Sequence, residues 1–228
     1  MNRRLSSLWK RWIAANALSE LAGLGATFLV IGLLTPQLAE RNTSTAVVTA
    51  FAIAVGSGTI EDTLVGMAQW WAMSPYFPAV ERGAWWRATL FGALFGYALG
   101  YLPSALADFG DASAQGVSAE PPQWLVLILA AALGAAAGAV LSFFQWRVLR
   151  KHVDGAGIWI PVNMLAWALG MPLIFEAMDL AFRMPELWQR VAVVAAGLLI
   201  AGAVVGIVHG RALVSLAEPA SSSDASLR

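Results

Sequence analysis

The chain has 228 residues, of which 59% are hydrophobic and only 12% are charged, and its formal net charge is zero. Soluble domains carry about 25% charged residues, and one of this length would expose large apolar patches, so the composition excludes an ordinary soluble protein. The zero net charge provides no general attraction for nucleic acid, and the absence of cysteine excludes disulfides, thiolate catalysis and thiolate metal sites.

Six apolar segments are long enough to cross a bilayer, which takes about 20 residues of helix. In chain order they cover roughly residues 12–34, 45–72, 85–104, 123–146, 158–181 and 190–214. The first is too long for the core of a signal peptide and contains Glu20 as its only charge. We therefore predict an all-α, polytopic membrane helix bundle. It forms one membrane domain over residues 1–217, and the short serine-rich tail 218–228 is expected to be disordered.

Lysine and arginine are distributed unequally between the two sides that these six segments define. Positive charge gathers on the cytoplasmic side of membrane proteins. One side carries eleven basic residues, namely Arg3, Arg4, Lys10, Arg11, Arg82, Arg87, Arg147, Arg150, Lys151, Arg211 and Arg228. The other side carries three, Arg41, Arg183 and Arg190, together with the acidic loop 108–120. The sequence thus predicts a multi-pass protein of a cytoplasmic (inner) membrane with both termini in the cytoplasm.

Tryptophan also gathers at the predicted cytoplasmic ends of the helices. An amphipathic indole ring favours the headgroup region of a bilayer. We therefore expect an interfacial aromatic belt made of Trp9, Trp12, Trp70, Trp71, Trp85, Trp86, Trp146 and Trp159.

An internal similarity divides the segments into three pairs, at about 12–72, 85–149 and 158–214. The first segments of the pairs share a tryptophan, a polar residue four positions later and a glycine eleven positions later: Trp12, Asn16 and Gly23; Trp85, Thr89 and Gly96; Trp159, Asn163 and Gly170. The second segments share a spacing that ends in a polar residue: Asp62, Gly66 and Gln69; Gly138, Ser142 and Gln145; Gly202, Gly206 and His209. This pattern predicts three helical hairpins repeated around an axis along the membrane normal.

The repeated polar residues are expected to lie at similar depth in the membrane. Side chains of this kind need partners in hydrocarbon, and small residues four apart let helix backbones approach closely. Asn16 pairs in depth with Gln69, Thr89 with Gln145, and Asn163 with His209. Two interpretations remain open at this point. These residues either hold neighbouring helices together, or form a polar ring around the pseudo-axis that faces the cytoplasm.

The segments Glu61-Asp-Thr-Leu-Val-Gly-Met-Ala-Gln-Trp70 and Gln145-Trp-Arg-Val-Leu-Arg150 resemble a family of bacterial multi-pass membrane proteins. The family has a recurrent EGxxxGxxQWxxLR motif followed by W(V/I)xAN. The resemblance covers most of the chain between Trp12 and Arg150. It departs from the motif at Asp62, where the family has glycine, and at the arginine expected after Gln69-Trp70. The family has no assigned activity, so the resemblance implies a prokaryotic membrane fold and no function.

Three acidic residues fall within the first predicted hairpin. Glu20 lies eight residues after Trp12 and Glu61 lies eight residues before Gln69, so both should sit about 12 Å from the same membrane boundary. Ionisable residues at this depth are costly, and two carboxylates there should share a proton or bind a cation. Glu20, Glu61 and Asp62 are therefore a candidate proton or cation site. The alternative is a protonated pair bonded to the backbone or to nearby hydroxyls, with Asp62 turned toward another helix.

A second acidic group, Glu176 and Asp179, follows a predicted break in the fifth segment at Gly170-Met171-Pro172. Proline removes a backbone hydrogen bond and usually kinks a helix, and acids beside interrupted helices can mark ion sites. The simpler interpretation is that these acids reach water at the outer boundary.

No catalytic motif is present: the sequence contains no G-x-S-x-G, no HExxH and no P-loop. His209 is the only histidine within the predicted spans, too few for bis-histidine haem, and its match with Gln69 and Gln145 favours hydrogen bonding. We expect no catalytic residues, no metal and no cofactor. The favoured function is a non-enzymatic structural or accessory component that contacts the lipid bilayer, with other membrane protein subunits as candidate partners. The alternative is a small proton- or cation-coupled transporter that uses Glu20 and Glu61.

Overall fold

The computed structural model describes residues 3–34, 44–110 and 121–218, which form an all-α bundle. Its long helices are α1 (Arg3–Leu34), α3 (Ser44–Met73), α4 (Arg82–Gly110), α5 (Gln123–Leu149), α6 (Trp159–Arg183) and α7 (Leu187–Ala217), with one 3₁₀ turn, η1 (Ala156–Ile158), before α6. The predicted fold class is confirmed. Among the described residues, five of the helices, α1, α3, α5, α6 and α7, are long and apolar enough to cross a membrane.

The helices are longer than the predicted spans, most clearly in α1. It begins at Arg3, nine residues before the first predicted span, because no proline or glycine interrupts the basic segment ahead of Trp12. The predicted break at Gly170-Met171-Pro172 is wrong, because α6 continues through Pro172 as one helix. The predicted tail from 219 onward and residues 111–120 of the acidic loop lie outside the described residues.

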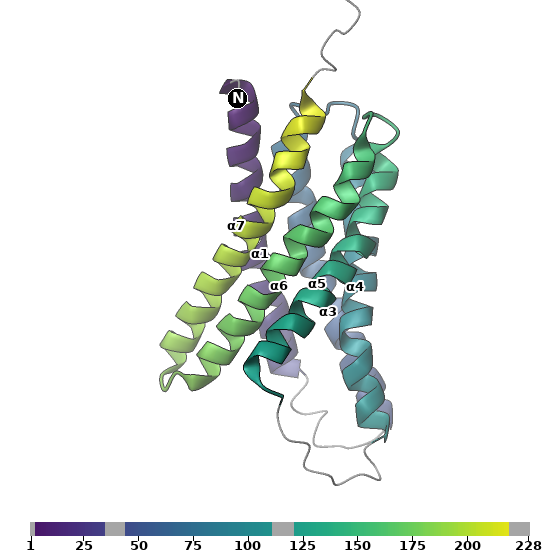
Figure 1. Ribbon diagram of the computed structural model, residues 1–228. Coiled ribbons are helices and arrows are strands. Elements are labelled where there is room, and N and C mark those ends of the chain that lie inside the picture. The colour runs from purple at the N-terminus through teal and green to yellow at the C-terminus, as the bar shows by residue number, and fades with distance from the viewer. Residues whose placement is uncertain (1–2, 35–43, 111–120, 219–228) are drawn as a thin grey trace, which may run out of the picture.

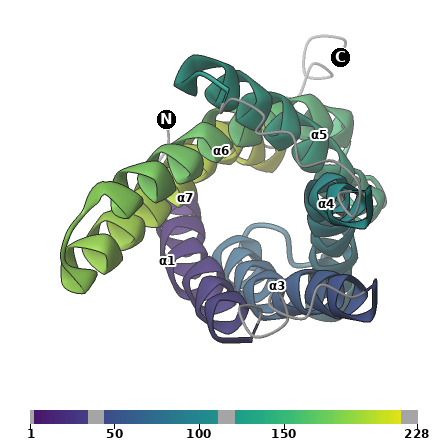
Figure 2. The same cartoon turned by 90° about the horizontal axis from the view of Figure 1, so that it is seen from below.

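The six long helices form a closed ring in which each one packs against its neighbours in sequence, and α7 returns to pack against α1. Figure 2 shows this ring along its axis, with α1, α3, α4, α5 and α6 surrounding its centre. The start of α1 and the end of α7 lie at the same end of the bundle, at the top of Figure 1. We call this the terminal end. The opposite end, where α6 turns into α7, is the loop end.

The outside of the ring is covered by large apolar side chains. Leu29 and Leu33 of α1 are 67% and 70% exposed, and Phe182 of α6 is 76% exposed. A soluble protein rarely exposes so continuous an apolar surface, whereas lipid is a good solvent for it. The bundle therefore has the surface of a membrane protein.

Glycine contacts hold the helices close together. A Cβ atom added at Gly202 would lie 2.8 Å from the carbonyl oxygen of Asn16, and one added at Gly206 would lie 2.9 Å from the Cα of Ile13. The close contact predicted for these two glycines is confirmed, and its partner is α1. Gly155 serves a different purpose: its φ of 71° makes the left-handed turn between α5 and α6, a conformation that glycine adopts at little cost.

Candidate functional site

The bundle core near the terminal end is built on three tryptophans, Trp12, Trp85 and Trp159, none of which has any exposed surface. The prediction that these three belong to an interfacial belt is wrong, because their rings point into the ring of helices. Trp12 and Trp85 each make an edge-on contact with Trp159, at 5.9 and 6.1 Å between ring centroids. Trp71 does lie at the surface, 57% exposed, with the Arg11 guanidinium 4.4 Å from its ring centroid.

Each buried tryptophan accepts the same local hydrogen bond. Its backbone carbonyl receives a side-chain donor from four residues later: Asn16 to Trp12 at 2.7 Å, Thr89 to Trp85 at 3.1 Å, and Asn163 to Trp159 at 2.8 Å. The bond orients the polar side chain and accounts for the shared spacing in the sequence.

The indole N–H groups of two tryptophans donate to polar residues on other helices. Trp12 donates to Nδ1 of His209 at 2.7 Å, and Trp159 donates to Oε1 of Gln145 at 2.9 Å. Since Nδ1 of His209 accepts a hydrogen bond, it carries no proton. The imidazole of His209 therefore accepts a tryptophan N–H, as the side-chain carbonyl of Gln145 does. The buried Nε1 of Trp85, in contrast, has no hydrogen-bond partner among the described residues.

The amides extend this network across the bundle. Gln69 donates to Oδ1 of Asn16 at 2.8 Å, and Gln145 donates to Thr89 at 3.0 Å and to Oε1 of Gln69 at 3.1 Å. The structure thus joins two of the three pairs that lie at equal predicted depth. Asn163 and His209 are both buried, but their described bonds go to Trp159 and Trp12 instead. We call this cluster the tryptophan plug. It consists of Trp12, Trp85 and Trp159 with the polar residues Asn16, Gln69, Thr89, Gln145, Asn163 and His209.

On the loop side of the plug, the helices line a partly open cavity of about 360 Å³. Its lining comes from α1, α3, α4, α5 and α6, and α7 contributes nothing. Leu24, Phe28 and Met171 are typical of its apolar wall.

Glu20, Glu61 and Asp62 all line this cavity. They are buried, with exposed fractions of 4%, 7% and 2%. The carboxyl groups of Glu20 and Glu61 interact electrostatically, and Asp62 interacts with both. The structure therefore brings the candidate acids together, and Asp62 does not turn away to another environment. Oε1 of Glu20 and Oδ2 of Asp62 have no hydrogen-bond partner among the described residues.

The nearby hydroxyl groups, which could have donated hydrogen bonds to these acids, donate to backbone carbonyls instead. Ser19, Ser57 and Thr59 each donate to a carbonyl three residues earlier on their own helix. The partner of Glu61 is instead the phenol of Tyr97, which donates to Oε2 of the carboxylate. Tyr97 was missed in the sequence because nothing in its spacing ties it to Glu61. Its ring lies so close to Gly58 that a Cβ there would come within 2.8 Å of it.

Contacts between equivalent positions recur around the ring. Each predicted hairpin has a glycine eleven residues after its tryptophan. A Cβ atom added at this glycine would approach a residue on the second helix of the same hairpin, eight positions before Gln69, Gln145 or His209. The approach is 2.7 Å from Gly23 to the Cα of Glu61, 3.6 Å from Gly96 to the Cβ of Ala137, and 3.8 Å from Gly170 to the carbonyl of Ala201. These partners match the positions that the sequence repeat makes equivalent.

By its position in the sequence pattern, Asp62 corresponds to Gly138 and Gly202, which lie where one predicted hairpin packs against the next. A Cβ at Gly138 would lie 2.7 Å from the carbonyl oxygen of Asn163, and one at Gly202 would lie 2.8 Å from that of Asn16. At these two junctions the backbones therefore touch. At the equivalent position α3 carries a carboxylate in place of glycine, and this side chain lines the cavity.

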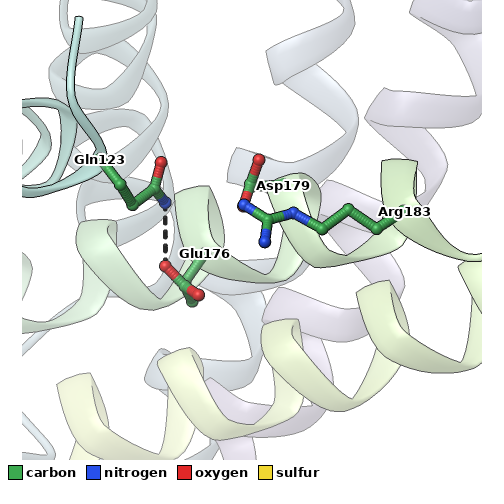
Figure 3. A network of polar contacts seen from close by, with 4 residues as sticks. All are labelled: Gln123, Glu176, Asp179 and Arg183. Atoms are coloured by element: carbon green, nitrogen blue, oxygen red, sulfur yellow. Dashed lines mark hydrogen bonds and ion pairs between the residues drawn. The ribbon is translucent and has the colours of Figure 1, made fainter.

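The other acidic pair lies in the second half of α6 (Figure 3), where neither acid is among the residues that line the cavity. Glu176 accepts a hydrogen bond from Gln123 at 3.0 Å, and Asp179 forms an ion pair with Arg183 at 2.5 Å. Both acids therefore have partners and neither lines the cavity. This arrangement favours the simpler interpretation, in which they are boundary residues.

Within residues 3–34, 44–110 and 121–218, no group of three or more His, Asp or Glu side chains is arranged to hold a metal ion. Comparisons with protein-family models, with curated proteins and with solved structures found no match to this chain. The functional argument therefore starts from the cavity and its three carboxylates.

Proposed function

We propose that this protein is a small membrane carrier that binds a proton or another cation at Glu20, Glu61 and Asp62. One observation carries the proposal: three buried carboxyl groups meet in a cavity whose lining, among the residues that the structure describes, includes no lysine, arginine or histidine. Buried acids in membrane proteins are costly unless a proton or cation compensates them, and such acids commonly mark transport pathways.

The proposed architecture is three helical hairpins related by a pseudo-threefold axis. The recurring tryptophan–carbonyl bonds and the recurring glycine contacts support it. In this arrangement the tryptophan plug closes the cavity toward the terminal end. Transport would then require the plug to open, because its indole and amide groups occupy the path between the cavity and that end.

We further propose that the terminal end faces the cytoplasm of a bacterial cell and that the membrane is the inner one. The excess of lysine and arginine at this end supports the orientation. The motif resemblance between Trp12 and Arg150 supports the bacterial setting.

The test is ion flux into proteoliposomes that contain the purified protein. Proton entry is followed with an internal pH dye, and sodium entry with ²²Na⁺, under an imposed potential. Glu20→Gln should abolish the flux while the protein still elutes as one folded species. Glu176→Gln is the matched control, because Glu176 is also an acid within a helix but does not line the cavity. Flux that is unaffected by Glu20→Gln would reject the acidic site, and flux of both ions that never exceeds that of empty vesicles would reject the carrier.

The competing proposal is a structural or accessory component of a larger membrane assembly. Close glycine contacts between α7 and α1 favour it, because helix backbones in such close contact have little room to move relative to each other. Purification in a mild detergent distinguishes the two proposals. A partner that co-purifies in a fixed ratio supports a subunit, and loss of that partner should leave any flux by the carrier intact.

A further inference from the structure

We propose that the cavity is a binding site for a small amphipathic organic cation, an ammonium group attached to one aromatic or branched apolar group. This inference rests on the proposed function and names the class of ligand for the same site. It follows from the separation of acidic and apolar groups along the cavity and from the cavity size.

The acids lie at the plug end of the cavity. Leu24 and Phe28 follow Glu20 by four and eight residues on α1, so they lie about 6 and 12 Å further toward the loop end. In α6, Trp167 lies level with Glu20 by repeat position, and Ile174 and Met178 extend the wall in the same direction. A ligand that enters with its charged end first would therefore place this end among the carboxylates and its apolar body along the wall.

Two features of the acidic end favour a charged nitrogen donor. Oε1 of Glu20 and Oδ2 of Asp62 are buried and lack donors among the described residues, and an ammonium group supplies up to three. Tyr97, which donates to Glu61, also lines the cavity, and it stacks at 6.0 Å between ring centroids on Tyr101, one helical turn further toward the loop end. Aromatic faces attract cations, most strongly where water is excluded.

The remaining wall favours an organic cation over a bare metal ion. A calcium ion takes six to eight oxygen ligands and a magnesium ion keeps several waters, which an apolar wall of leucine, phenylalanine and methionine does not provide. The volume of about 360 Å³ exceeds what a single ion occupies, and it lies at the lower end of the range of about 300–1,000 Å³ for small-molecule pockets. One ring with a short amine side chain suits this space.

The test uses 2-phenylethylammonium as the probe and the full-length protein in lipid nanodiscs. Binding of radiolabelled probe is measured by scintillation proximity, with protein-free nanodiscs as the blank for partition into lipid. Unlabelled 2-phenylethylammonium should displace the label, whereas 2-phenylethanol, a neutral molecule of similar shape, should compete at least about tenfold less well. Glu61→Gln and Asp62→Asn should each weaken binding by about tenfold or more. Glu176→Gln should leave it unchanged.

Equal competition by 2-phenylethanol, or no saturable binding above the blank, would overturn the inference. Because the comparison of charged and neutral probes uses the unmodified protein, it stands even if an acid variant fails to fold. Flux that depends on Glu20 without binding of 2-phenylethylammonium would retain the carrier and reject the organic cation. Saturable, charge-dependent binding without flux of either ion would retain the ligand site and reject the ion carrier.

Discussion

The three buried tryptophans differ in one respect that can be measured: Trp12 and Trp159 have hydrogen-bond acceptors for their indole N–H groups, and Trp85 has none among the residues that the structure describes. Replacement by phenylalanine at each position retains an aromatic ring and removes the N–H. All three side chains have 0% exposure, so each replacement loses a similar amount of packing. The replacements should therefore differ mainly in their hydrogen bonds.

The expected difference follows from what each replacement leaves unpaired. Trp12→Phe leaves Nδ1 of His209 without its donor, and a buried acceptor left in this state costs about 1–3 kcal/mol. Interhelical hydrogen bonds in membranes average only about 0.6 kcal/mol, because the unfolded protein in the membrane also finds partners. Trp85→Phe removes a donor that is already unpaired. We expect Trp12→Phe to destabilise the protein by about 1–2 kcal/mol more than Trp85→Phe.

The measurement is the free energy of unfolding in detergent, followed by far-UV circular dichroism, for the wild type and the three single variants. Trp159→Phe should resemble Trp12→Phe, because it deprives Oε1 of Gln145 of its donor. His209→Gln is a control that keeps an acceptor opposite Trp12 and should cost little. The reasoning is refuted if the three tryptophan variants are equally destabilised, or if Trp85→Phe is the most damaging.

Three further predictions test the packing, the acidic site and the topology. Gly206→Leu should destabilise the bundle by about 1–3 kcal/mol through overpacking against the α1 backbone, and an unchanged melting temperature would show that this contact does not exist. Gly58→Ala should push the ring of Tyr97 away from α3, so that the phenol O–H stretch in infrared spectra shifts as its bond to the carboxylate weakens; an identical spectrum would contradict the contact. Cysteine at Ser74, in the connection at the terminal end, should resist an impermeant thiol reagent added outside whole cells, whereas cysteine at Glu186, at the loop end, should react; the reverse result would invert the proposed orientation.

The relative positions of the site residues along the helix axes could largely be predicted from the sequence. Glu20 and Glu61 were placed level with each other from their distances to Trp12 and Gln69, and both now line one cavity. This works because a helix rises by a constant 1.5 Å per residue, so a count of residues gives depth. The hydrogen bonds from Gln69 to Asn16 and from Gln145 to Thr89 follow the same arithmetic.

Direction around each helix could not be predicted in the same way. A tryptophan near a helix end usually lies at the membrane interface, yet Trp12, Trp85 and Trp159 fill the core. The sequence leaves two environments open for Asp62 and does not indicate Tyr97 as the partner of Glu61. In each case the answer depended on which neighbouring helix the residue faces.

The sequence alone determined that this is an all-α membrane bundle, where its apolar segments lie, and that Asn16 is level with Gln69 and Thr89 with Gln145. These properties are local, since the length of an apolar segment and the rise of a helix require no knowledge of the neighbours. Only the tertiary structure decided that the helices close into a ring, that Trp85 lacks an acceptor, and that three acids share one cavity. The rotation of a membrane helix about its axis is set by packing against all its neighbours at once, and a count of residues along one helix does not contain that information.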